Sequence, residues 1–409
     1  MPVAWSHTPA SWHGPGAAHI TDVPGTQAPA PSQISSPLQA FPSPQGAPLS
    51  FGVATQPEPG SQRSVTHGFW LSQTTAAPPV QTTGWVSSTS TVSEALKAAG
   101  LQDREYLRIT MAFNGYGATK GAYQPDDLTP FIQHPLVKGS FHWVNHTFTH
   151  ENLDAATART TRDELNNNIK IAAKLDLPNF TRATLVTPDV SGLGNAVFLK
   201  AARKIGVRYV VSDTSRAGSA NPSPNTGIMN PLEPGIYMIP RYPNSLFFNV
   251  ASPADWAAEY NCIYRGFWGR DLDYSEILDV ESDRFLTYLL KGDMNLWMFH
   301  QTNLDAYDGT HTLLTDLLDA TIVKYNRITN RPILSPPMEA IGAAMQARAA
   351  YNASGVRATW NADGSVTIRV ARKAVVPITG LDTANAEVYG DERISRVAVK
   401  PHAPVTLPR

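Results

Sequence analysis

The sequence predicts an α/β fold with parallel strands, for which a (β/α) barrel is the preferred closure, followed by a small β module. From about residue 92, short β-branched and aromatic runs alternate with longer amphipathic runs, which is the order of βαβ units. The 409 residues, 42% of them hydrophobic, suffice for one large core and a small second module. Near the carboxyl end of the chain this alternation gives way to a hairpin signal.

Residues 1–90 differ in composition from the rest of the chain. Their only acidic, lysine or arginine residues are Asp22, Glu58 and Arg63, and they hold 14 of the 33 prolines. Such a segment cannot bury enough apolar surface to offset its chain entropy, so we expect a disordered or irregular Pro/Ser/Thr-rich stretch. Two origins fit about equally well: a natural linker, or a shifted reading frame or misplaced start.

The helices and strands that follow are marked by their end signals. A capping box of Thr161 with Glu164 opens one helix, Gly206 stops another, and Thr310 or Thr312 caps a third. The expected helices span 160–177, 194–206, 252–264, 282–293 and 310–329. The expected strands span 107–113, 140–144, 183–186, 207–212, 236–240 and 295–299.

The barrel is expected to occupy residues 91–350, and a small antiparallel β module residues 355–409. In this last segment an Asp363–Gly364 turn joins two runs of alternating hydrophobicity, which is a hairpin signal. Few strands are visible there, so the module is expected to be small or to be part of a sandwich.

Charge and hydropathy exclude several classes of partner. The net charge is −1 and the pI about 6.8, so nothing indicates binding to nucleic acid or to an anionic membrane. No apolar run approaches the ~20 residues that a membrane-spanning helix needs. Cys262 is the single cysteine, so no intrachain disulfide forms. The N-terminus shows no secretory signal, because no basic segment precedes an apolar stretch.

Polar side chains follow the six expected strands, and two of them are histidines. Chemistry gathers at the carboxyl ends of barrel strands, so these residues are candidates for one site. His146 and His150 project from one side whether their stretch is helical or extended, which lets both imidazoles reach one cation. The alternative is a pair of capping or loop histidines, and His142 is expected in the core. The strand-end candidates are Asn114, His146, Asp189, Asp213, Arg241 and His300.

The other candidates each have a structural and a functional interpretation. His300 ends a buried strand, where a histidine acts as a general acid near neutral pH or hydrogen-bonds a neighbouring loop. Asp189 and Asp213 are metal ligands or orient the histidines, or else, as we expect, cap helices. Asn114, Asp189 and Arg241 are candidates for substrate contact.

Together these residues resemble a known family. Residues 107–335 resemble the polysaccharide deacetylase (NodB-homology) barrel. The segments "MAFNGYG", "FHWVNHTFTHENLD" and "TPDVSGLGN" resemble the fungal galactosaminogalactan deacetylases and their bacterial relatives. The segment "HTFTH" matches the His-[Ser/Thr]-x-x-His metal motif, which implies His146 and His150 as ligands. The segment "LWMFHQTN" matches the last motif, which implies His300 as the catalytic histidine.

The resemblance implies a metal-dependent hydrolase that acts on amide C–N bonds. A divalent cation, most often Zn²⁺, would activate a water and polarise the acetamide carbonyl, backbone N–H groups would stabilise the oxyanion, and His300 would protonate the departing amine. The implied substrate is a polysaccharide containing N-acetylated amino sugars. The implied location is extracellular or at the cell surface.

One part of the family pattern is missing. Family members carry paired aspartates on a strand before "RITMAF", one a metal ligand and the other the base, whereas residues 23–102 contain no aspartate. We therefore expect a barrel without its first strand and a chain with little or no activity. The competing hypothesis is a non-catalytic carbohydrate-binding protein on the same barrel. A glycosidase using Asp189 and Asp213 ranks below both.

Overall fold

The computed structural model has a parallel β-sheet at its centre. It describes residues 107–408 apart from 120–125, 127, 134, 330, 332, 382, 384–385 and 390–391, so the N-terminal segment 1–90 lies outside the described residues. All six expected strands are present within a few residues of their predicted bounds. They are β1 (Thr110–Phe113), β2 (His142–Asn145), β3 (Thr184–Leu185), β4 (Tyr209–Asp213), β6 (Tyr237–Tyr242) and β7 (Leu296–Trp297).

The six strands run parallel in the order β1-β2-β3-β4-β6-β7. A short strand that the sequence did not indicate, β5 (Ile228–Met229), pairs antiparallel with β6. The parallel sheet confirms the expected α/β class. Within the described part of the chain, no strand pairing joins β1 to β7, so the expected barrel closure is not shown.

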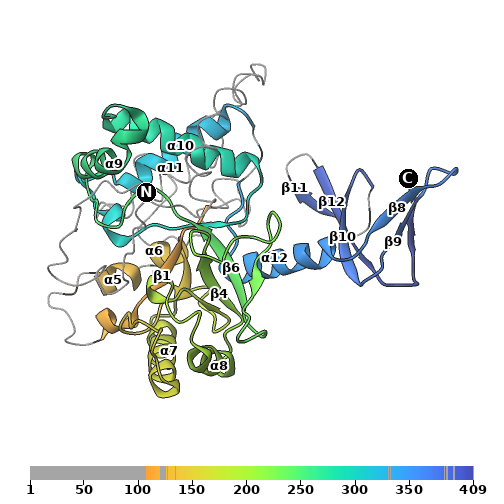
Figure 1. Cartoon of the computed structure of the whole chain (residues 1–409), viewed down its shortest axis with the longest axis horizontal. Helices are drawn as coiled ribbons and strands as arrows, with labels where there is room; N and C mark the ends of the chain where they lie inside the picture. The colour runs from red at the N-terminus through yellow and green to blue at the C-terminus, as the bar shows by residue number, and fades with distance from the viewer. Residues whose placement is uncertain are drawn as a thin grey trace.

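Helices flank the sheet on both sides. They are α5 (Leu128–Gln133), α6 (Pro135–Gly139), α7 (Ala158–Lys174), α8 (Ala196–Ile205), α9 (Pro253–Trp268), α10 (Tyr274–Leu290), α11 (Leu313–Asn326) and α12 (Met338–Asn352). Figure 1 shows α7 and α8 together on one side and α9, α10 and α11 gathered on the opposite side. No helix among the described residues is long and apolar enough to cross a membrane.

Two helix ends follow the predicted signals. The side-chain oxygen of Asn195 caps the first turn of α8, which ends at Gly206 with a φ of 126°. Thr312 caps α11 by accepting a hydrogen bond from the backbone N–H of Thr315. These local signals suffice to predict where a helix starts or ends, because each one involves residues within a single turn.

The predicted capping box of α7 is wrong. Thr157 caps this helix by accepting a hydrogen bond from the N–H of Thr160, so α7 starts earlier than expected. Thr161 and Glu164 lie inside the helix and are buried. A buried glutamate inside a helix requires a partner other than the helix end.

The sheet is buried on both faces, as expected for parallel strands. Val210 of β4 packs with Leu165 of α7 and Phe198 of α8, whereas its neighbour Val211 packs with Met345 of α12. A third cluster joins the sheet to α9, α10 and α11 and contains the fully buried Trp256. The strand period of two therefore sends alternate side chains of β4 into two different cores.

The C-terminal residues form two antiparallel three-stranded sheets. Their strands are β8 (Arg357–Trp360), β9 (Val366–Arg369), β10 (Ala374–Thr379), β11 (Glu387–Tyr389), β12 (Glu392–Val399) and β13 (Val405–Leu407), in the orders β10-β12-β11 and β13-β9-β8. The predicted Asp363–Gly364 turn joins β8 to β9, which confirms the hairpin. Ile368, Val376 and Val397 share one cluster, so the two sheets pack on a common core.

Candidate functional site

Two histidine rings lie side by side just after β2. The ring centroids of His146 and His150 are 4.8 Å apart, and the ring planes meet at 77°. Both side chains are partly buried. His142, inside the strand, is buried in the core with its Nε2 2.8 Å from the carbonyl oxygen of Ser335. The structure thus brings together the two histidines whose spacing predicted a shared target.

Backbone groups of neighbouring strands orient His146. Its N–H donates to the carbonyl of Phe113 at the end of β1, over 3.1 Å. Its Nδ1 lies 2.8 Å from the carbonyl oxygen of Val186, just after β3. Because a carbonyl oxygen only accepts, Nδ1 carries a proton and Nε2 holds the lone pair of the neutral ring.

The segment that carries the pair has an unusual backbone. Thr147 has a φ of 67° and His150 a φ of 65°, both in the left-handed region that non-glycine residues rarely occupy. The N–H of the fully buried Thr147 donates to Oδ1 of Asn145 over 2.9 Å. Such a conformation persists only where surrounding contacts impose it.

Asn114 is one of these contacts. Its Nδ2 donates to the carbonyl oxygens of His146 and Thr147, at 2.5 and 3.0 Å. The residue therefore ties the end of β1 to the histidine segment. Its predicted contact with a substrate stays a prediction.

Asn168 of α7 provides a second contact from behind the sheet. Its fully buried amide donates to the carbonyl of Phe113 and to Oδ1 of Asn145, both over 2.7 Å, and accepts from the N–H of Gly115 over 2.6 Å. One side chain thereby fixes the carboxyl ends of β1 and β2 relative to each other.

The histidine pair fits two ligands of a divalent cation. Metal-binding histidines usually donate their other ring N–H to a carbonyl or carboxylate, as His146 does. Among the described residues, however, no three His, Cys, Asp or Glu side chains are grouped so that they could hold a metal ion. A catalytic zinc site uses three protein ligands, so this part of the chain offers two candidates for them, and the metal role of His146 and His150 stays a prediction.

His300 follows β7 at the same edge of the sheet. It directly precedes the 3-10 helix η5 (Gln301–Leu304), and its N–H donates to Oδ1 of Asn303 over 2.9 Å. Its ring lies edge-on to Phe248, with centroids 6.0 Å apart. Parallel strands place His300 and the histidine pair at the same edge, with β3, β4 and β6 between their strands.

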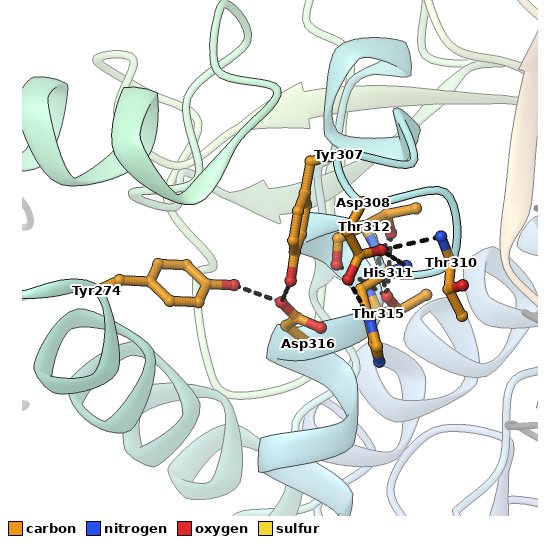
Figure 2. A network of polar contacts seen from close by, with 8 residues as sticks. All are labelled: Tyr274, Tyr307, Asp308, Thr310, His311, Thr312, Thr315 and Asp316. Atoms are coloured by element: carbon orange, nitrogen blue, oxygen red, sulfur yellow. Dashed lines mark hydrogen bonds and ion pairs between the residues drawn. The ribbon is translucent and has the colours of Figure 1, made fainter.

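A polar network holds the segment that follows η5 (Figure 2). The hydroxyls of Tyr274 and Tyr307 both donate to Oδ2 of Asp316 over 2.5 Å. Burial, and then the hydrogen bond to Asp316, raises the pKa of both tyrosines. Both hydroxyls therefore stay protonated; Tyr274 links α10 to α11, and Tyr307 links the segment after η5 to α11.

Asp213 and Arg241 form a buried ion pair at the ends of β4 and β6. The Nε of Arg241 lies 3.1 Å from Oδ2 of Asp213. Burial lowers the pKa of Arg241, and the neighbouring carboxylate opposes this effect. Oδ1 of Asp213 accepts hydrogen bonds from the N–H and hydroxyl of Ser215, which makes a turn and not a helix start. The predicted cap at Asp213 is wrong, and the substrate contact of Arg241 stays a prediction.

Asp189 does not cap a helix either, because Asn195 occupies that position for α8. It lies in the 3-10 helix η4 (Pro188–Val190) with a φ of 53°, and its carbonyl accepts a hydrogen bond from Arg216 over 2.6 Å. The predicted substrate contact of its carboxylate stays a prediction.

The model of the Agd3 deacetylase domain family matches residues 75–358, which is more than half of the chain. The chain belongs to this family. A solved structure described as "Crystal structure of Agd3 a novel carbohydrate deacetylase" has a similar fold, with a TM-score of 0.59 and 21% sequence identity. The likeness covers 71% of this chain and 48% of that one, so this chain spans about half the length of that protein. No curated protein sequence matches the chain.

The family match confirms the resemblance noted in the sequence, and it contains His146, His150 and His300. It also contains two residues of α7 that sequence reasoning missed: Asn168, which contacts the ends of β1 and β2, and Glu164, which accepts hydrogen bonds from Phe148 and Thr149 of the histidine segment. The sequence does contain a signal for Glu164 and Asn168. They are two polar residues four positions apart, next to the apolar stripe of an amphipathic helix, which indicates that both face the sheet. Most of the C-terminal sheets lie beyond the match.

Proposed function

We propose that the chain is a metal-dependent deacetylase that removes N-acetyl groups from an N-acetylhexosamine polysaccharide, one similar to galactosaminogalactan. Membership of the Agd3 deacetylase domain family supports the reaction class. The observation that carries the proposal is the convergence of His146 and His150, whose ring centroids lie 4.8 Å apart in the matched region. The substrate implies an extracellular or cell-surface location.

The two histidines would hold the cation through their ring nitrogens, His146 through Nε2. Zn²⁺ or another divalent cation, when bound, supplies Lewis acidity toward the acetamide carbonyl and the attacking water. Asn114 would keep the pair in place by donating to the carbonyls of His146 and Thr147, and Asn168 by its hydrogen bonds to the ends of β1 and β2. The chain would thereby hold these two ligands in position before a cation binds.

His300 is the proposed proton donor to the departing amine. Amide hydrolysis requires this proton, because an unprotonated amide anion is a very poor leaving group, and histidine supplies it near neutral pH. The contacts to Asn303 and Phe248 fix the position of His300 at the edge of the sheet where β2 also ends. The approach of His300 to the pair is part of the proposal.

One observation favours a second candidate function. Residues 23–102 contain no aspartate, so the paired-aspartate motif that family resemblance implies is not found there. A chain with the histidine pair and without this motif would turn over slowly. The second candidate is accordingly a carbohydrate-binding protein that has kept the fold and lost the reaction.

Acetate release and metal content test both candidates. The full chain is incubated with Zn²⁺ and a polymer of N-acetylgalactosamine and galactosamine, beside His146→Ala, His150→Ala and His300→Ala. We expect the first two variants to lose their bound metal. We expect their acetate release to fall to background. We expect His300→Ala to keep the metal and to release acetate about 100-fold or more slowly.

His402→Asn is the matched control. His402 is exposed in the C-terminal sheets at a φ of 58°, a conformation that asparagine tolerates, so this variant should match the wild type. Polymer binding without any acetate release would favour the carbohydrate-binding candidate. Undiminished acetate release by His146→Ala would refute the metal site.

A further inference from the structure

Helix α7 directs a buried carboxylate at the histidine segment. Glu164 is only 8% exposed, and Asn168, four residues later on the same face, is fully buried. Acidic side chains are seldom buried unless they are paired. Among the ion pairs of the described residues none involves Glu164, and Thr157 rather than Glu164 serves the helix cap.

The partners of Glu164 lie between the two histidines. Oε2 accepts hydrogen bonds from the backbone N–H groups of Phe148 and Thr149, at 2.9 and 2.8 Å. Oε1 accepts one from the hydroxyl of Thr149, at 2.7 Å. All three hydrogen bonds are donated to Glu164, which matches the acceptor-only character of an ionised carboxylate.

These partners sit at the most strained part of the segment. Phe148 and Thr149 are flanked by Thr147 and His150, whose φ angles of 67° and 65° are left-handed. Such a conformation is unfavourable for a non-glycine residue and persists only where its surroundings impose it. The turn offers two adjacent backbone N–H groups to one oxygen atom, and Glu164 is the acceptor that receives both.

We propose that Glu164 is a positioning residue for the metal site. Its carboxylate holds Phe148 and Thr149, and thereby sets the left-handed turn that brings His150 beside His146. Glu164 acts through the backbone of this segment, while its oxygens are occupied by the three donors. The inference rests on the proposed function, because it assigns a consequence for metal binding.

Three variants separate this role from a general structural one. Glu164→Ala removes all three acceptors. Glu164→Gln keeps the shape: its amide oxygen can accept the two N–H groups, and the hydroxyl of Thr149 can turn to accept from the amide. Asp163→Ala is the control, because Asp163 is the adjacent acidic residue with a side chain 65% exposed.

Two measurements are made on the full chain. Amide hydrogen exchange at Phe148 and Thr149 reports the turn directly, and calorimetric titration with Zn²⁺ alone reports the site. For Glu164→Ala we expect exchange at both amides to accelerate at least about 10-fold. We expect its Zn²⁺ affinity to fall by about 10- to 100-fold, as for other outer contacts of metal ligands.

Glu164→Gln should show a smaller loss of Zn²⁺ affinity, about 3- to 10-fold, because neutral acceptors make weaker hydrogen bonds. Asp163→Ala should match the wild type. If Glu164→Ala fails to fold, Glu164→Gln decides the question by the same two measurements.

The inference would be overturned if a folded Glu164→Ala variant bound Zn²⁺ with wild-type affinity, whatever the amide exchange shows. If the alanine variant does not fold, wild-type Zn²⁺ affinity in Glu164→Gln would overturn it. Failure of the wild type itself to bind Zn²⁺ would instead count against the proposed function. The two failures are therefore distinct.

Discussion

Backbone carbonyls and carboxylates give the histidines of this chain different properties. Nδ1 of His146 meets a carbonyl oxygen, which fixes the tautomer without adding charge. Nδ1 of His311 meets Oδ2 of Asp308 at 2.7 Å, which favours the charged ring. The first arrangement suits a ligand to a cation, and the second suits a surface ion pair.

The His311–Asp308 pair has a defined pH window. The hydrogen bond that the ring of His311 donates to Asp308 raises the pKa of His311 above its ordinary value of 6.5. The contribution of this pair to stability is therefore complete below pH 6.5 and is lost as pH rises through the folded pKa. The backbone N–H and ring of His311 lower the pKa of Asp308 from 3.8 to about 2, so that contribution is lost as pH falls toward 2.

Asp308→Asn should return the pKa of His311 toward 6.5. Proton NMR titration of the ring measures this value directly, and both side chains are about half exposed, so the change will not unfold the chain. Asp319→Asn is the control, because Asp319 is the weakest contributor to the raised pKa. An unchanged titration of His311 in Asp308→Asn would contradict the hydrogen bond shown in Figure 2.

At the scale of elements, buried side-chain amides hold the loops at the carboxyl edge of the sheet. Asn303 of η5 is fully buried and donates to the carbonyls of Phe247 and Val250, at 2.8 and 3.0 Å. Its Oδ1 accepts the N–H of His300. Asn303 thus joins the loop after β6 to the one after β7, as Asn168 joins β1 to β2.

Asn303→Ala should lower the free energy of unfolding by about 1–3 kcal/mol, because it leaves buried carbonyls without donors. Urea denaturation measures the loss. Gln301→Ala, an exposed position in the same 3-10 helix, should change it by less than about 0.5 kcal/mol. Equal effects of the two substitutions would show that Asn303 does not anchor these loops.

The elements that the sequence predicted well are those specified by local pattern. Six parallel strands, the stop of α8 at Gly206, the cap at Thr312 and the hairpin at Asp363–Gly364 all depend on neighbouring residues. The helix-cap predictions for Asp189 and Asp213 failed, because Asn195 caps α8 in place of Asp189 and because Asp213 ends a strand and pairs with Arg241 of another strand.

The same limit applies to Glu164, whose spacing from Thr161 imitates a capping box. Its actual partners, Phe148 and Thr149, lie 16 and 15 residues away and meet it only after α7 has packed on the sheet. The positions of the two metal-ligand candidates could be predicted because one turn contains both. The groups that hold them could not, because they come from other strands and from the back of the sheet.

At the scale of the whole molecule, α12 joins the parallel sheet to the C-terminal sheets (Figure 1). Met338 and Met345 pack in the sheet core, while Tyr351 at the far end packs against the core of the C-terminal sheets. Gly342 lies between these contacts, under the ring of Tyr209, whose hydroxyl donates to Gln346 over 3.0 Å. The close approach of Tyr209 to Gly342 lets α12 pack against the sheet core at one end and the core of the C-terminal sheets at the other.

Two glycine-to-alanine substitutions test this arrangement. An added Cβ at Gly342 would lie 2.4 Å from Cδ1 of Tyr209, so α12 or the ring must move, and we expect a loss of about 1–3 kcal/mol in the free energy of unfolding. Gly266 lies in α9, exposed, with no atom within 4 Å of an added Cβ. Gly266→Ala should therefore raise the free energy of unfolding by about 0.5–1 kcal/mol, since alanine is the better helix former.

The opposite signs matter more than the sizes, because the two substitutions have the same effect on the unfolded chain. Urea denaturation gives both values. Amide exchange around Tyr351 should also accelerate in Gly342→Ala, because displacement of α12 disturbs the C-terminal core as well as the sheet. If Gly342→Ala were as stable as Gly266→Ala, Tyr209 would not pack closely on α12, and the helix would not connect the two parts of the molecule in this way.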